Sequence, residues 1–264
     1  MNSKLWDVNF KFFNENLNYV LKETISKAKN DKLIPNYVNV LTGIDKLSVS
    51  NRYKTISLNC SPSLFPLNIK ELTPEILGNF YDENLFKKPL LSVLTHAITN
   101  DLSYVIIQQR TNKTSQGHSQ FQPAAAGYVD SQENPQNSAV REFREEVSDL
   151  LGGIDSILIP ESLGLTTHYI AGNKELVNPL LGYIIKVDKN QVMKKLKVVK
   201  NLEELDRLSE IKDIEVSKLA LVSYENFENI WGEIVDSKRN FGDVNEGVGK
   251  SVKQFINYIN SKEL

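Results

Sequence analysis

The clearest capacity for chemistry in this sequence lies in four carboxylates on one predicted helix. On an α-helix over residues 135–151, a rotation of 100° per residue brings Glu142, Glu145, Glu146 and Asp149 into an arc of about 100°. Like charges one turn apart destabilise a helix by about 0.2–0.5 kcal/mol per pair, so a bound counter-charge is expected. Hard divalent cations such as Mg²⁺ bind through a few carboxylates together with substrate phosphates. The face is therefore typical of a metal-assisted phosphoryl-transfer site.

The alternative interpretation of this helix is a solvated acidic face, because Glu-rich helices are common. Its other face is apolar within an arc of about 120°, which indicates packing on a core. The residues of that face are Ala139, Val140, Phe143, Val147, Leu150 and Leu151. Pro135 suits the first turn of a helix, and Gly152-Gly153 is a typical stop.

The spacing of residues in this segment favours the chemical interpretation. A glycine is followed after five residues by a glutamate, and after seven more by Arg-Glu-hydrophobic-x-Glu-Glu. The residues of this pattern are Gly127, Glu133, Arg141, Glu142, Phe143, Glu145 and Glu146. The pattern resembles the box of the Nudix hydrolases at each of these positions, on a predicted strand, loop and helix.

The segment departs from the Nudix box at its two ends. The usual closing glycine is Ser148, and the hydrophobic residue that follows it is Asp149. The glycine pair that commonly opens the box reads Ala126-Gly127. We therefore expect the turn at the end of the helix to lie later, at Gly152-Gly153. None of these changes removes a carboxylate.

The resemblance implies a site for Mg²⁺ or Mn²⁺. Its ligands would be Glu142, Glu145 and Glu146, together with the backbone carbonyl of Gly127. Glu142 and Glu145 would be the catalytic residues, with Glu142 orienting or deprotonating the attacking water. The resemblance thus predicts hydrolysis of a diphosphate linkage.

Supporting and substrate-binding residues also follow from the resemblance. Arg141 would fix the helix by pairing with a carboxylate, with Glu133 as the expected partner, although ordinary helix salt bridging is the alternative. Arg110, at the end of a predicted strand, matches the place of a basic residue that faces the substrate diphosphate, and a guanidinium suits phosphate. An exposed strand-end arginine is the alternative there.

The order of elements is similar to the branch of the family that hydrolyses UDP-glucose and UDP-galactose, and to the ADP-ribose branch. In the UDP-sugar branch a Pro-x-aromatic strand in an N-terminal lobe helps to stack the base, and Pro35-Asn36-Tyr37 has that form. The resemblance implies a substrate-binding role for Tyr37, whereas the residue type alone favours a core strand position. The predicted reaction releases a nucleoside monophosphate and a phosphorylated partner.

Two other functions fit parts of the pattern. Isopentenyl diphosphate isomerases of the same superfamily are faintly similar at Ala124-Ala-Ala-Gly127, but they need a catalytic cysteine, and Cys60 precedes the box domain. A Nudix-fold module that senses a nucleotide without cleaving it is the remaining alternative. Such modules typically lose box glutamates, and all of them are present here.

Composition places the chain among ordinary globular proteins. Hydrophobic residues make up 41% and charged residues 24% of 264, with a formal net charge of −2, so nucleic acid is not an expected partner. One cysteine excludes an internal disulfide, and the three histidines lack zinc-ligand spacing. His118 and His168 fall in predicted polar loops that could border the site, and the alternative for both is an exposed or hydrogen-bonded histidine without a role in it. We find no targeting or membrane-spanning segment and expect a cytoplasmic protein.

The elements that position the box follow from hydrophobic periodicity. We predict a first helix over 7–31, strands over 37–44, 46–49 and 53–59, and a hairpin formed by 90–98 and 102–109. A strand over 121–129 precedes the box helix, further strands cover 163–168, 180–187 and 215–222, and the chain ends with helices over 224–234 and 244–259. The predicted class is α+β, an α/β/α Nudix sandwich with a mixed sheet in residues 90–264, preceded by a small β-rich N-terminal lobe in residues 1–89.

Overall fold

The computed structural model of the protein describes residues 5–111, 119–154, 159–170, 173–213, 215–239 and 247–262. The strands are β1 (Asp7–Phe12), β2 (Val40–Ser50), β3 (Thr55–Leu64), β4 (Ser92–Thr99), β5 (Tyr104–Arg110), β6 (Phe121–Pro123), β7 (Ala125–Tyr128), β8 (Glu161–Ile170), β9 (Asn173–Val187), β10 (Val198–Val199) and β11 (Val216–Ser223). The α-helices are α1 (Glu15–Asn30), α2 (Pro74–Leu77), α3 (Pro135–Phe143), α4 (Lys189–Lys195), α5 (Leu202–Asp206), α6 (Tyr224–Asp236) and α7 (Gly247–Asn260). Short 3₁₀ turns are η1 (Pro66–Lys70), η2 (Gly78–Phe80), η3 (Glu83–Phe86) and η5 (Asp149–Leu151), and a π-helical turn is η4 (Arg144–Ser148).

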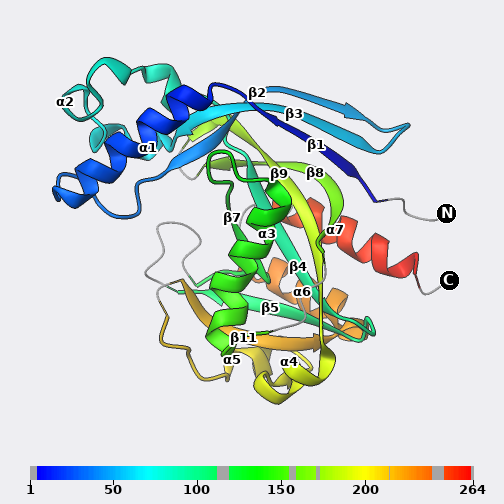
Figure 1. Ribbon diagram of the computed structural model, residues 1–264. Helices are drawn as coiled ribbons and strands as arrows, with labels where there is room; N and C mark the ends of the chain where they lie inside the picture. Colours follow the sequence, from blue (N-terminus) through cyan, green and yellow to red (C-terminus); the bar gives the residue numbers. More distant parts are fainter. Residues whose placement is uncertain are drawn as a thin grey trace.

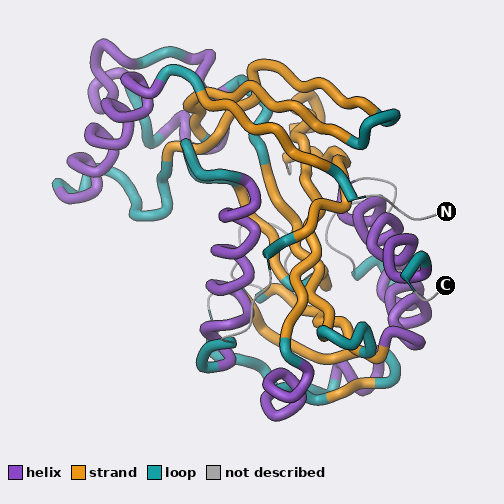
Figure 2. Tube along the Cα trace, turned by 45° about the vertical axis from the view of Figure 1, so that its right-hand side comes forward, coloured by secondary structure: helices purple, strands orange, loops and turns teal. Residues whose placement is uncertain are grey.

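A mixed sheet with helices on both faces forms the larger part of the molecule. Its strands follow the order β10-β11-β5-β4-β9-β8, with β6 paired to β5 and β7 paired to β4. Strands β4 and β9 run parallel, whereas β4 and β5 form the antiparallel hairpin expected from the sequence. Helix α3 covers one face, while α6 and α7 cover the other, as the two views together show (Figures 1 and 2). The predicted α/β/α sandwich is confirmed.

Successive buried residues along the central strands pack into two hydrophobic cores, one on each face of the sheet. Ile106 packs with Phe143 and Val147 on the α3 side, whereas its neighbour Ile107 packs with Phe255 of α7 on the opposite side. Successive side chains of a strand point to opposite faces, so one buried strand supports both helical layers. The helix that carries the box is therefore held to the sheet by a continuous apolar face.

The N-terminal lobe contains a three-stranded sheet in the order β1-β3-β2. The predicted helix over 7–31 is wrong in its first part, because Asp7–Phe12 is a strand paired in parallel with β3 and the helix begins only at Glu15. Val8, Phe10 and Phe12 alternate with more exposed residues. This period of two is typical of a strand, and the predicted helix did not account for it. The strands predicted over 37–44 and 46–49 are one strand, β2, with a register shift between Ile44 and Lys46.

The three-stranded sheet is packed directly on the larger one. Ile56 and Leu58 of β3 share a buried cluster with Val93 of β4 and Ala139 of α3. The proposed boundary between residues 1–89 and 90–264 remains a prediction. Within the described ranges, none of the helices combines the length and apolar character that a bilayer-spanning segment requires.

Candidate active site

The box helix changes its winding where the carboxylates lie. It is α-helical to Phe143, π-helical over Arg144–Ser148 and 3₁₀ over Asp149–Leu151. A π-helical turn adds a residue to the turn and is frequent at functional sites. This winding changes the angular positions assumed for a regular helix: Glu146 is buried, whereas Glu145 and Asp149 are exposed.

Ser148, which replaces the usual closing glycine of the box, has a structural role. The hydroxyl oxygen of Ser148 accepts a hydrogen bond of 2.8 Å from the N–H of Ile154 and so ties the helix end to the chain that follows. The chain turns in the left-handed region at Gly152 (φ 72°) and Gly153 (φ 88°), where glycine is favoured. The later turn expected from the sequence is confirmed.

Glu142 lies in close contact with the strand that opens the box. A Cβ atom placed on Gly127 would lie 2.2 Å from the Glu142 carboxyl carbon, so only glycine permits this approach. Nη1 of Arg141 donates to Oε1 of Glu142 at 2.6 Å. Burial raises the pKa of Glu142 to about 7, against the opposing effect of Arg141. The carboxylate is thus held in a partly desolvated position beside the backbone of β7.

Arg141 connects three carboxylates of the box. The predicted ion pair with Glu133 is present, with Nη2 3.1 Å from Oε2, and the same guanidinium lies 3.3 Å from Oε2 of Glu145. Nη2 also donates to the carbonyl of Tyr128 at 3.3 Å. Arg141 therefore joins the box loop (residues 129–134) to the helix, and the Glu145 side chain is turned toward Arg141 rather than toward Glu146.

Glu146 is held by amide donors from the sheet. Its Oε2 accepts hydrogen bonds from Nε2 of Gln108 at 2.7 Å, from Nε2 of Gln122 at 3.3 Å and from the N–H of Ala126 at 3.3 Å. Its Oε1 lies 3.8 Å from Nη1 of Arg110. Burial raises the pKa of Glu146 to about 8, with Arg110 acting in the opposite direction. Hydrogen bonds from the sheet thus fix Oε2 of Glu146, whereas Oε1 faces the guanidinium of Arg110.

Sequence reasoning missed Gln108, Gln122 and Glu215. Gln108 and Gln122 are directly opposed across β5 and β6, and both are buried. A buried glutamine within an apolar strand is a usable signal, because a buried amide needs a polar partner. Glu215, just before β11, raises the pKa of both Glu142 and Glu146 through its charge, and no sequence pattern connects it to the box.

The sequence also singled out Arg110, Tyr37, His118 and His168, and the structure describes all of them except His118. Arg110 lies at the end of β5 beside Glu146, and its side chain is only 13% exposed. Tyr37 is 68% exposed, in the turn between α1 and β2, so the core strand interpretation of this residue is wrong. His168 lies in strand β8, as the predicted strand over 163–168 implies and not in a loop, and its Nε2 shares a hydrogen bond of 2.7 Å with the Ser92 hydroxyl, which fits the alternative of a hydrogen-bonded histidine. His118 is outside the described residues.

The donors at the site suit a hard divalent cation in their chemistry. Glu142 and Glu146 are buried carboxylates, and the charge of Glu142 raises the pKa of Glu146, so a cation between them would relieve a real electrostatic cost. Over the described ranges, no three acidic, histidine or cysteine side chains converge as a metal-binding group, since Glu145 is turned to Arg141. Glu142 and Glu146 are therefore the residues best placed to hold a metal.

The comparison with protein-family models agrees with the Nudix box identified in the sequence. The NUDIX domain family matches residues 89–191, which include the box, so the resemblance predicted from the sequence is confirmed for this part of the chain. No curated protein matches the chain.

Several solved structures are similar to parts of the chain. The protein DR0079 from Deinococcus radiodurans shares 14% identity over 63% of this chain and 83% of its own, with a TM-score of 0.38. The NUDIX domain of NrtR from Shewanella oneidensis, complexed with ADP ribose, shares 14% over 72% and 97%, with a TM-score of 0.35. A UDP-X diphosphatase shares 12% over 66% and 74%, with a TM-score of 0.33.

Proposed function

We propose that the protein hydrolyses the diphosphate linkage of a nucleoside diphosphate joined to another moiety, of the UDP-sugar or ADP-ribose type. The reaction depends on Mg²⁺ or Mn²⁺ and releases a nucleoside monophosphate and a phosphorylated partner. The observation that carries this proposal is the pair of buried box carboxylates, Glu142 and Glu146, held against β7 and beside Arg110.

Each residue has a distinct part in the proposed reaction. Glu142 and Glu146 would hold the cation, with Glu145 and the Gly127 carbonyl as the further ligands proposed from the box. A bound divalent cation neutralises diphosphate oxygens and lowers the pKa of a water molecule. Arg110 binds the diphosphate, since a guanidinium matches phosphate oxygens.

The chemical step is a displacement at phosphorus. A bond forms between the water oxygen and one phosphorus, the bridging P–O bond breaks, and the leaving phosphate keeps the bridging oxygen. Glu142 orients the water and accepts its proton. Arg141 and Glu133 fix the helix from the side of the box loop.

Turnover of a substrate panel tests this proposal. The protein is incubated with Mg²⁺ and UDP-sugars, ADP-ribose, dinucleoside polyphosphates and CDP-alcohols, and products are separated by chromatography. We expect hydrolysis of at least one nucleotide sugar or ADP-ribose, and loss of it in Glu145→Gln. Absence of turnover with every member, or equal turnover by the variant, would contradict it. Binding of a nucleotide without Mg²⁺-dependent turnover would favour the sensor function instead.

A further inference from the structure

A cavity of about 210 Å³ lies between α1, the start of β2 and the box loop. It is lined by Lys22, Ile25, Ser26, Lys29, Asn39, Val40 and Asp130. Liquid water takes about 30 Å³ per molecule, so the space suits a small polar ligand rather than a large one. None of its lining residues belongs to the carboxylate site described above.

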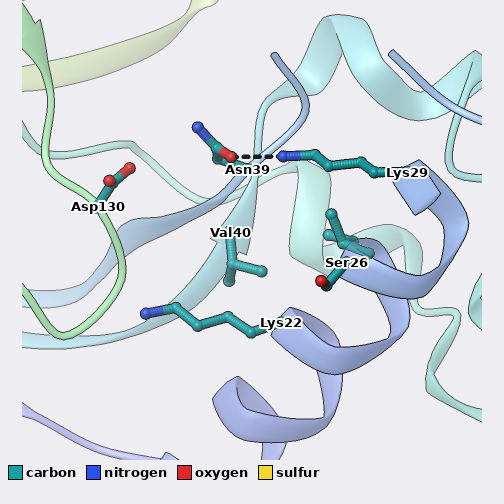
Figure 3. Close-up of a pocket in the computed structure, with 7 residues that line it drawn as sticks. Lys22, Ser26, Lys29, Asn39, Val40 and Asp130 are labelled. Carbon is teal, nitrogen blue, oxygen red and sulfur yellow. Dashed lines mark hydrogen bonds between the residues drawn. The ribbon is translucent and has the colours of Figure 1, made fainter. Parts of the chain in front are cut away.

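The helix sequence explains why polar groups line this cavity. Leu21, Ile25 and Ala28 form the buried stripe of α1. Lys22 and Lys29 each lie one residue further along, which is a rotation of 100° toward the edge of that stripe. Their alkyl chains therefore run beside the apolar contact, while their ammonium groups reach out over β2, as Figure 3 shows.

The two lysines retain hydrogen-bonding capacity. Nζ of Lys22 donates to the carbonyl of Ser131 at 2.9 Å, and Nζ of Lys29 donates to Oδ1 of Asn39 at 2.9 Å. Both acceptors are neutral, and each ammonium carries three donors. Among the described residues, Lys22 and Lys29 form no salt bridge of 4.0 Å or less, and Asp130 acts on both through its charge at longer range. The wall of the cavity formed by α1 thus carries two ammonium groups, and each has N–H donors left that could bind an anion.

The opposite wall carries the complementary group. Asp130 faces the cavity from the box loop, across the space from both lysines (Figure 3). Burial and the charge of Glu133 raise its pKa, and the charges of Arg141, Lys22 and Lys29 oppose that effect. A ligand that fills the space would therefore meet cations on one side and a hydrogen-bond acceptor on the other.

We propose that this cavity binds a small sugar phosphate. The tetrahedral phosphate would bridge Lys22 and Lys29, since lysine binds phosphate as a point charge, and a planar carboxylate has fewer oxygens for two separated cations. Hydroxyl groups of the sugar would donate to Asp130 and bond to the Asn39 amide. This ligand class includes the phosphorylated product of the proposed hydrolysis, and that link alone rests on the proposed function.

The position of the cavity connects its occupant to the catalytic loop. The carbonyl that Lys22 contacts belongs to Ser131, whose N–H donates to the carbonyl of Val40 at 3.0 Å. Two residues further along, Glu133 pairs with Arg141 of the box helix. A phosphate that draws Lys22 from Ser131 would change the hydrogen bonding of this loop.

Calorimetric binding of glucose 1-phosphate tests the site without turnover. The titration is done in EDTA with the full chain, beside inorganic phosphate and glucose, so its outcome is independent of hydrolysis. We expect one site per chain for glucose 1-phosphate, weaker binding of inorganic phosphate and none of glucose. Lys22→Met and Lys29→Met should each weaken binding about tenfold, as for the loss of a charged hydrogen bond.

Two control variants separate this cavity from other cationic places. Lys27→Met removes an exposed lysine of the same helix, and Lys253→Met removes an exposed lysine of α7; both should bind glucose 1-phosphate as the wild type does. No binding up to 10 mM, equal affinity for inorganic phosphate, or full binding by the Lys22 and Lys29 variants would overturn the proposal.

Amide hydrogen exchange gives an independent location for the ligand. Glucose 1-phosphate should slow exchange in peptides from residues 18–40 and 129–134, and leave those from α7 unchanged. Protection confined to residues 105–110 and 142–146 would place the ligand at the carboxylates and contradict the proposed cavity.

Discussion

Replacement of Glu146 by glutamine should stabilise the metal-free protein, and by more at higher pH. The buried carboxyl has a pKa of about 8 in the folded chain, against about 4.5 when unfolded. Between these values the unfolded chain has lost the proton that the folded chain retains, so stability falls as pH rises from about 4.5 to about 8. Below that window the group is protonated in both states and costs nothing.

The size of this effect follows from the same two pKa values. Between pH 5.5 and pH 8.5 the cost of burying Glu146 grows by about 3 kcal/mol, with each pKa unit contributing about 1.4 kcal/mol. Glutamine occupies nearly the same volume, and its side-chain oxygen can accept the bonds from Gln108 and Gln122. The variant should therefore keep the fold and lose the contribution of Glu146 to the pH-dependent cost, while that of the buried Glu142 remains.

Urea unfolding in EDTA, followed by tryptophan fluorescence, measures this difference. The free energy of unfolding is determined for wild type and Glu146→Gln at pH 5.5, 7.0 and 8.5. We expect the variant's advantage to grow across the series, and Glu145→Gln, at an exposed position, to follow the wild type. A constant difference between wild type and Glu146→Gln over this range would refute the reasoning.

Three further predictions concern the same region. Gly127→Ala should lower turnover about 100-fold, measured as kcat, because its Cβ would overlap the Glu142 carboxylate and displace it; wild-type kcat in this variant would contradict the close approach. Gln108→Met should weaken Mn²⁺ binding, followed by electron paramagnetic resonance, by about 10–100-fold, the usual effect of losing a partner that orients a metal ligand. Gln109→Met is its matched control on the opposite strand face, and equal affinities of the two variants would refute the assignment. Ser148→Ala should lower the free energy of unfolding by about 1 kcal/mol without changing kcat, and an unchanged urea midpoint would refute it.

The box could be predicted from the sequence because its residues lie close together along the chain. Gly127 and the helix carboxylates lie within 20 residues, so the chain position and the helical period together predict their proximity. The later helix end was also predictable, since glycine at positive φ has a physical reason at Gly152 and Gly153. The π-helical turn was not, because no residue type specifies it.

The site residues that come from distant segments of the chain could not be predicted from sequence spacing. Gln108 and Gln122 reach Glu146 only because β5 and β6 pair in one register, and strand register depends on tertiary packing. The first strand was missed because Val8, Phe10 and Phe12 satisfy both a helical and an alternating pattern over so few residues. Its partner, β3, settles the choice.

Hydrolysis in ¹⁸O-enriched water, with mass spectrometry of both products, tests the central claim most directly. With Mg²⁺ and a nucleotide sugar or ADP-ribose as substrate, we predict one ¹⁸O atom in one phosphate product and none in the other. Glu142→Gln and Glu146→Gln should incorporate little label over the same time. Label at carbon instead of phosphorus, or incorporation by both variants at the wild-type rate, would contradict a carboxylate-held metal site that directs water to a diphosphate.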